Sequence, residues 1–370
     1  MRKRQAAVLD FGSSGITLAV GERGVNKTFI IKSRSFYEYD GFQDGVFFDA
    51  DKLALVLKKA VDGLIRNFSK TIDCLYVGVP GEFTEVEVKE SQISFSHKKK
   101  IRDEDIDSLF DAAFVLRSKK YTVINRSAVI YELDDGRRLA NPLGATSEIL
   151  KGRLTFILCS NYFIENVEPI IRSSGITNIE FVSSVLAEAL YLVDAESRDR
   201  IAVIADVGYI SSTFFIIQGD GILFKRSFSY GGGYITAALT EKFDLDFPVA
   251  ENLKRKVNLS SRPISGASDL ILCENGEYYS GEEVKEVILS SLDMLCEDIS
   301  KALDEFGYNV PEYVPLMITG GGIAYIRGAK EHVAGRLGMS VQIVAPNVPL
   351  MDKPTESSVL SVLDMALEQD

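Results

Sequence analysis

The chain has 370 residues, enough for two or three domains of roughly 150 residues each. Its 41 basic and 53 acidic side chains give a net charge of −12, which excludes a main role in binding bare nucleic acid, because that role needs a dominant basic face. Hydrophobic residues make up 46% and charged residues 25%, as in folded globular proteins. The four cysteines are widely separated and no apolar run reaches the roughly 18 residues of a membrane span. We therefore expect an acidic, soluble, cytoplasmic protein.

The first predicted element is an apolar strand that ends in a turn rich in glycine and serine. The strand covers residues 6–9, and a second strand resumes at residues 16–20. A hairpin of this kind exposes backbone N–H groups and hydroxyls at its tip. The residues of the turn are Asp10, Gly12, Ser13, Ser14 and Gly15.

Residues 81–159 have a different pattern. An alternating strand begins near Phe83, a helix is predicted over 102–116 with Asp103 as its cap, and two or three further strands follow. This length of chain, about 75 residues, is enough for a small α+β domain inserted into the larger body.

A second apolar strand, residues 201–208, repeats the first unit. It also ends in an aspartate, with a glycine two residues later and then hydroxyls: Asp206, Gly208, Ser211 and Ser212. Two such units in separate halves of the chain predict duplicated lobes that face each other across a cleft. A third turn after an apolar strand contains Gly320, Gly321 and Gly322, and Gly232 begins a predicted helix after the second unit.

These turns suggest a nucleotide site. Glycine turns can surround phosphate oxygens with backbone N–H groups because no Cβ stands in the way. Mg²⁺ is commonly held by one or two carboxylates together with phosphates and waters, so Asp10 and Asp206 could hold the hydrated ion from opposite lobes. The third glycine turn would lie against the base and ribose. Each turn alone also occurs as a plain turn, and it is the set of three that predicts a nucleotide cleft.

At this point the chain resembles the actin-like ATPase superfamily. The two aspartate turns are similar to its two phosphate motifs, and residues 318–322 to its adenosine motif. The resemblance implies an α/β actin-like ATPase fold, with two duplicated lobes around the cleft. Glu251 and Lys254 match an acid and a lysine that reach the ribose and base, although an exposed charge pair on a helix explains them equally well.

Within the superfamily the chain resembles the bacterial cell-division family FtsA over essentially the whole catalytic body. The sequence SFSHKKKIRDEDI at residues 94–106 and NPLG at 141–144 are similar to FtsA. The resemblance implies subdomain 1A at 1–80 and 160–198, an FtsA-type 1C insertion at 81–159, 2A at 199–255 and 315–370, and 2B at 256–314.

The resemblance also implies a function. An FtsA-like protein would bind ATP and Mg²⁺, self-associate into filaments through 1C, and grip the C-terminal peptide of the tubulin-like protein FtsZ through 2B. It would act at the inner face of the cell membrane at the division site. Residues 359–370 contain acids but no Lys or Arg, so we expect that helix to pack in the core. Membrane attachment would then use a C-terminal helix missing from this sequence, or another protein.

The chain departs from the FtsA pattern in both phosphate motifs. Gly15 stands where FtsA has a lysine, and Tyr209 and Ile210 replace two glycines of the second motif, so phosphate contacts there should be looser or shifted. Residues 181–186 contain no acid to orient an attacking water, and Glu188, one helical turn beyond Ser184, is interpreted as a surface charge. We therefore expect nucleotide binding with weak or absent ATPase activity.

Two other functions remain open on the sequence. A small-molecule kinase on the same fold would need a general base for its substrate, and none stands out near the second phosphate motif. An FtsA cousin that serves pilus assembly or plasmid positioning would share the fold and have other partners.

Overall fold

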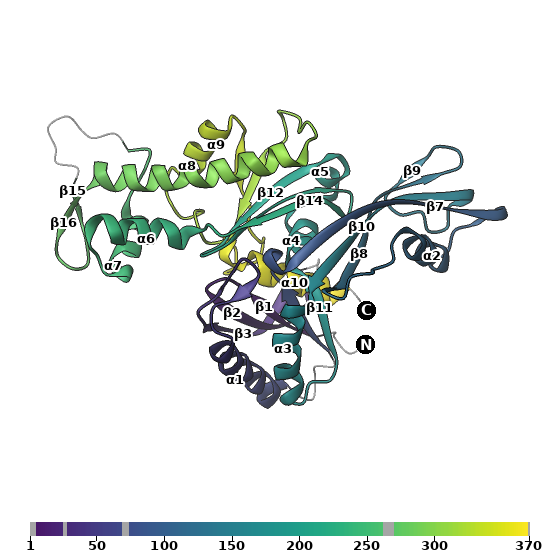
Figure 1. Ribbon diagram of the computed structural model, residues 1–370, viewed down its shortest axis with the longest axis horizontal. Helices are drawn as coiled ribbons and strands as arrows, with labels where there is room; N and C mark the ends of the chain where they lie inside the picture. The colour runs from purple at the N-terminus through teal and green to yellow at the C-terminus, as the bar shows by residue number, and fades with distance from the viewer. Residues whose placement is uncertain (1–4, 25–27, 69–73, 262–269, 369–370) are drawn as a thin grey trace.

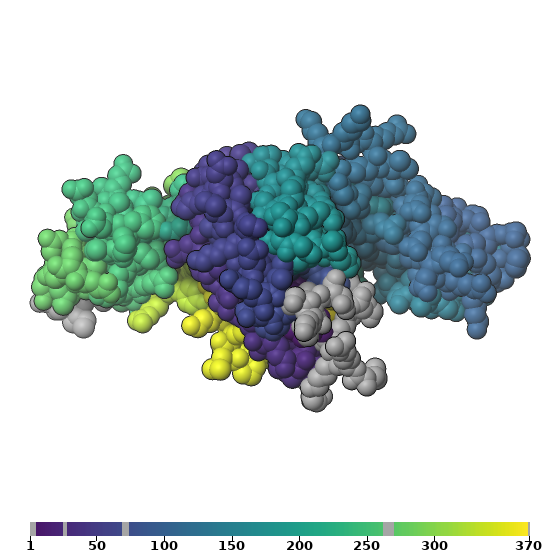
Figure 2. Space-filling model, turned by 90° about the horizontal axis from the view of Figure 1, so that it is seen from below, coloured from purple at the N-terminus to yellow at the C-terminus, as the bar shows by residue number. Residues whose placement is uncertain are grey.

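The computed structural model describes residues 5–24, 28–68, 74–261 and 270–368. The protein is elongated, with a first lobe in the middle of one face, an inserted domain at one end and the helical part of a second lobe at the other (Figures 1 and 2). Each lobe is built on one five-stranded mixed sheet, and the insertion has a separate four-stranded sheet.

The sheet of the first lobe has the strand order β11-β6-β1-β2-β3. β1 pairs antiparallel with β2 and parallel with β6, and both of its faces are buried, as its continuous apolar sequence predicts. α1 and α3 cover one face (Figure 1). The bounds are β1 Gln5–Phe11, β2 Gly15–Arg23, β3 Phe29–Glu38, β4 Phe42–Gln43, β5 Val46–Phe47, α1 Ala50–Phe68, β6 Leu75–Val79, α3 Asn161–Ser173 and β11 Ile179–Ser183.

The sheet of the second lobe repeats this arrangement, with the order β14-β13-β12-β17-β18. β12 pairs antiparallel with β13 and parallel with β17, as β1 does with β2 and β6. The predicted duplication is therefore confirmed. The bounds are α5 Ala195–Arg200, β12 Ala202–Val207, β13 Ser212–Gln218, β14 Gly221–Phe228, α6 Gly232–Phe243, α7 Phe247–Lys256, β15 Leu270–Leu272, β16 Tyr278–Ser280, α8 Gly281–Phe306, β17 Leu316–Thr319, α9 Ala329–Leu337 and β18 Val341–Ile343.

The inserted domain follows a short 3₁₀ turn, Gly81–Phe83. Its sheet has the order β7-β10-β8-β9, and helix α2 packs on one face over a small apolar core of its own. The bounds are β7 Thr84–Lys100, α2 Asp103–Ala113, β8 Tyr121–Leu133, β9 Arg138–Leu139 and β10 Thr146–Ser160.

The start and end of α2 differ from the prediction. Asp103 is the first helical residue and not the cap; Arg102 takes that position, and the carboxylate of Asp105 accepts a hydrogen bond from its backbone N–H. The helix ends at Ala113 because Phe114 adopts an extended backbone and its ring packs on Phe156, 4.8 Å between centroids. Packing of an aromatic side chain into the core thus overrides the helical pattern beyond residue 113.

Two helices fill the space between the lobes, α4 (Ser184–Leu192) and α10 (Ser357–Glu368). Both are apolar on nearly all sides, and their core includes side chains from β1 and β12 of the two sheets. The expectation that the last helix packs in the core is therefore confirmed. Among the described residues, no helix is long and apolar enough to span a membrane.

Candidate functional site

The two aspartate turns meet at one pocket between the lobes, with a volume of about 340 Å³. Asp10 lies near the end of β1 and Asp206 near the end of β12, so the duplicated sheets bring both carboxylates to it. Most of the predicted site residues line the same pocket: Gly12, Ser13, Ser14, Gly15, Gly208, Ser211, Gly320 and Gly321.

The carboxylate of Asp10 is buried and accepts hydrogen bonds from two serine hydroxyls. Ser184 Oγ at the start of α4 lies 3.2 Å from Asp10 Oδ1, and Ser358 Oγ in the first turn of α10 lies 2.8 Å from it. Burial raises the pKa of Asp10 to about 6, although both hydrogen bonds act to lower it. Loss of solvent, and then the charge of Asp10, raise the pKa of Asp206 to about 7.

Glu188 is a correction to the sequence interpretation. It is not a surface charge: its side chain is only 2% exposed and lines the pocket with the two aspartates. α4 lies between the two lobes, so even its polar face is enclosed. Burial raises the pKa of Glu188 well above its usual value, and Asp206 and then Asp10 add to the shift. Besides Glu356, which is paired with Arg34, the pocket therefore has three carboxylates where the sequence suggested two.

These carboxylates suit a hydrated cation. The side-chain charges that raise the pKa values of Asp206 and Glu188 are those of other acids, so a divalent ion would relieve their repulsion. Within the described part of the chain, however, no three His, Cys, Asp or Glu side chains are grouped tightly enough to hold a metal ion. An ion here would therefore keep water molecules between itself and some of these oxygens.

The predicted adenosine residues lie beside the pocket and contact one another. Lys254 Nζ donates to the carbonyl of Gly232 and to Thr236 Oγ1, both at 2.8 Å, and pairs with Glu251 Oε2 at 2.7 Å. Burial acts to raise the pKa of Glu251. The contacts with Lys254 and Thr236 outweigh burial, so the pKa lies below its usual value. Glu251 and Lys254 are thus not a simple exposed pair, because the lysine is 4% exposed and holds the start of α6.

Close backbone packing fixes the remaining predicted glycines. Gly232 lies so near Gly322 that a methyl group on Gly232 would come within 2.4 Å of the Gly322 carbonyl oxygen. Ser212 does not line the pocket, since its hydroxyl is buried and donates to the Tyr230 carbonyl at 2.5 Å. The backbone N–H of Gly322 also donates to the Val207 carbonyl at 2.7 Å, so the second and third glycine turns are joined behind the cleft.

Several pocket residues had no signal in the sequence. Arg34 on β3 forms a two-pronged ion pair with Glu356, with both N–O distances 2.8 Å, at the edge of the pocket. Thr355 and Arg255 also line it. Arg34 and Glu356 are more than 300 residues apart in the chain, and the packing of the C-terminal segment on the first sheet brings them together.

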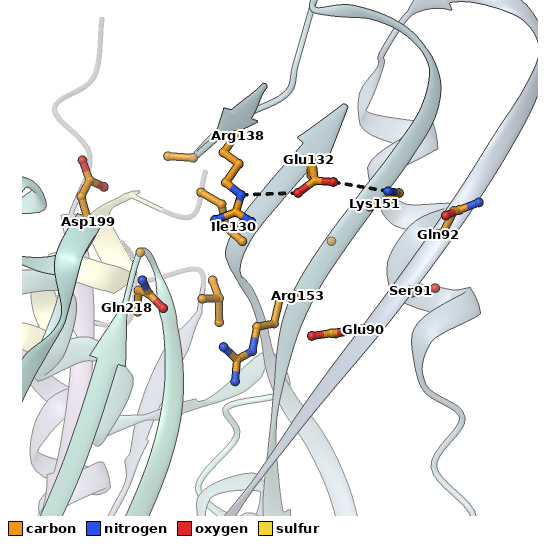
Figure 3. A pocket seen from close by; sticks show the side chains of 14 residues that line it. Glu90, Ser91, Gln92, Ile130, Glu132, Arg138, Lys151, Arg153, Asp199 and Gln218 are labelled. Carbon is orange, nitrogen blue, oxygen red and sulfur yellow. Dashed lines mark hydrogen bonds and ion pairs between the residues drawn. The ribbon is translucent and has the colours of Figure 1, made fainter. Parts of the chain in front are cut away.

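A larger cavity, about 880 Å³, lies between the inserted sheet and the turn that joins β13 and β14 (Figure 3). Figure 3 shows Glu132 between Arg138 and Lys151, at 3.4 and 3.3 Å, and Arg153 pointing into the cavity near Glu90. Its lining has charges of both signs and lacks the glycine turns of the cleft between the lobes.

Comparisons with known proteins agree with this architecture. A family model described as type IV pilus assembly protein PilM matches residues 177–265. The cell division protein FtsA of Streptococcus pneumoniae is 23% identical over 368 residues, which cover 97% of this chain and 79% of the relative.

Solved structures show the same fold. The PilM-PilN type IV pilus biogenesis complex contains a chain with a TM-score of 0.66 and 16% identity, with 99% of both chains covered. MreB5 of Spiroplasma citri bound to ADP has a TM-score of 0.55 and 13% identity, with 98% of this chain and 95% of the other covered.

The two matching sheets, the pocket between them and these likenesses define an α/β protein with the actin-like ATPase fold. Within that class the chain is similar to the FtsA proteins of Streptococcus pneumoniae and Enterococcus hirae, at 23% and 21% identity over most of its length. The similarities support an actin-like protein of the cell-division or pilus-assembly type.

Proposed function

We propose that this protein is a nucleotide-binding, actin-like scaffold of cell division. One observation supports the nucleotide site above all: the two duplicated turns and the third glycine turn bring Asp10, Asp206 and Gly320 to a single pocket between the lobes. The adenosine phosphate would lie against the glycine turns, and Mg²⁺ would be held through water by Asp10 and Asp206. The ion would neutralise phosphate charge.

The cellular role follows the similarity to FtsA. The protein would form filaments through the inserted 1C domain, bind the C-terminal peptide of FtsZ through 2B, and act at the inner face of the cell membrane at the division site. Hydrolysis of the nucleotide would be slow or absent, because Tyr209 and Ile210 replace the glycines of the second phosphate turn.

A second candidate is a role in pilus assembly. It is favoured by the PilM model match and by the likeness to the PilM chain of the PilM-PilN complex. In this case the partner would be a PilN-like protein in place of FtsZ. The same cleft would serve both functions, so the partner alone distinguishes them.

The test is electron microscopy of the purified protein with adenine nucleotide on a lipid monolayer, with and without FtsZ, together with binding of an FtsZ C-terminal peptide in solution. Filaments and FtsZ-peptide binding are the expected result. If neither occurs and a PilN-like protein binds, the pilus-assembly function replaces the cell-division one.

A further inference from the structure

The two phosphate turns contact each other directly. The backbone N–H of Ile210 in the second turn donates to Ser13 Oγ in the first turn at 3.0 Å. The Ile210 side chain reaches the first lobe, where a methyl group placed on Gly41 would lie 2.9 Å from Ile210 Cδ1 and 2.3 Å from the Ser13 carbonyl oxygen. A hydrogen bond and an apolar contact thus link the lobes across the phosphate-binding end of the cleft.

Several donors of these turns are already used within the protein. Gly12 N–H bonds to the Gly15 carbonyl at 2.9 Å, and Gly208 N–H to the Ser211 carbonyl at 3.0 Å. With Ile210 N–H on Ser13, three backbone donors at the ends of the two turns do not face a ligand. A phosphate held between the turns would need to break at least the contact between them, since it would have to separate Ile210 from Ser13.

The turn cannot easily move away. The carbonyl of Tyr209 accepts a hydrogen bond from Gly233 N–H at 2.7 Å, and that of Gly208 accepts one from Gly232 N–H at 2.9 Å, so the helix α6 holds the turn from behind. The Tyr209 ring packs on Gly233 and lies 6.3 Å from the ring of Phe247. Tyr209 and Ile210 therefore fix the second turn against both lobes.

The charge and the volume of the pocket also disfavour a third phosphate. The floor of the pocket has Asp10, Glu188 and Asp206, and each additional phosphate brings more negative charge to it. A volume of about 340 Å³ is also near the lower end for a ligand pocket. Ser14, Gly320 and Gly321 are among the other residues that line the pocket.

We propose that the cleft selects nucleoside diphosphates over triphosphates, because Ile210 holds together the two turns between which a terminal phosphate would lie. This inference rests on the proposed nucleotide-binding function and names the ligand class of that site. Selection would follow from the cost of displacing Ile210 from Ser13 and Gly41, a cost that a diphosphate does not incur.

The test is competition of ADP and ATP, each with Mg²⁺, against a fluorescent ADP analogue on the full chain. We expect ADP to bind at least about tenfold more tightly than ATP. Ile210→Gly should bring the two affinities within about threefold of each other, mainly by improving ATP binding. Ile210→Ala, which keeps the backbone restrained, should show an intermediate ratio and guards against a folding defect of the glycine variant.

Ile343→Gly is the matched control, since Ile343 is exposed on β18 of the same lobe and outside the cleft. The ratio of its affinities for ADP and ATP should equal that of the unchanged protein. The proposal is overturned if the unchanged protein binds ATP as tightly as ADP or more tightly. It is also overturned if Ile210→Gly leaves the ratio of the two dissociation constants unchanged. Failure of both nucleotides and the fluorescent analogue to bind would instead overturn the proposed function.

Discussion

Glu188 is the residue whose placement most changes the view of the cleft. A buried carboxylate beside two others is costly for the nucleotide-free fold, because like charges and loss of solvent both disfavour its ionised form. We predict that Glu188→Gln raises the melting temperature of the protein at pH 8 in EDTA, because the amide keeps the shape of the side chain without its buried charge. Thermal unfolding measures the effect.

Glu165→Gln is the control for this substitution, because Glu165 is an exposed glutamate on α3 in the first lobe. Its melting temperature should match that of the unchanged protein. A lower melting temperature for Glu188→Gln would show that the carboxylate makes a stabilising contact that outweighs its burial and repulsion.

The aspartates of the cleft were predictable and Glu188 was not, for a physical reason. Asp10 and Asp206 each end an apolar strand next to a glycine turn, and a strand end has a local sequence pattern. The exposure of Glu188 depends on what covers α4, and that cover includes α10, about 170 residues further along the chain. A charged residue on a short helix gives no local sign of such a cover.

At the scale of elements, Arg198 connects α5 to its neighbours. Its guanidinium donates to the carbonyls of Leu190, Val193 and Gly219 and pairs with Asp220 at 2.9 Å. The Arg198 side chain is 13% exposed, so without it few water molecules could reach these carbonyls and donate hydrogen bonds to them. We predict that Arg198→Ala costs about 2–4 kcal/mol of stability, measured by urea denaturation.

Two further variants define the cause of that loss. Arg198→Lys keeps the charge but not the planar fork, so it should recover less than half of the stability. Arg200→Ala, at an exposed arginine of the same helix, should change stability by less than about 0.5 kcal/mol. Equal effects of Arg198→Ala and Arg200→Ala would mean that loss of helix propensity or charge, and not the carbonyl contacts, is responsible.

The elements themselves could largely be predicted from the sequence. The repeated strand–turn–strand pattern gave the duplicated sheets, because an apolar strand with a fixed turn at its end is a local signal. The helix boundaries depend on long-range packing and were less predictable: α2 ends where Phe114 turns to meet Phe156. The position of α10 between the lobes had no local signal either, although its apolar composition indicated burial.

At the scale of the whole molecule, the cleft couples lobe packing to protonation. The raised pKa values of Asp10, to about 6, and Asp206, to about 7, mean that the folded protein binds protons more tightly than the unfolded chain between about pH 4 and pH 7. Stability from these groups is therefore present at low pH within that window and is lost as the pH rises through it. The carboxylates then repel each other at the interface of the two lobes.

We predict that, in EDTA and without nucleotide, the melting temperature falls by several degrees as the pH rises from 5 to 8, and that Asp206→Asn reduces this slope. Mg²⁺ with ADP should reverse the effect at pH 8, because the ion favours the ionised carboxylates and binds only the folded state. Asp352→Asn, at an exposed aspartate outside the lining of the pocket, is the matched control and should keep the slope. If Asp206→Asn also leaves the slope unchanged, the cleft carboxylates do not govern how the two lobes respond to pH.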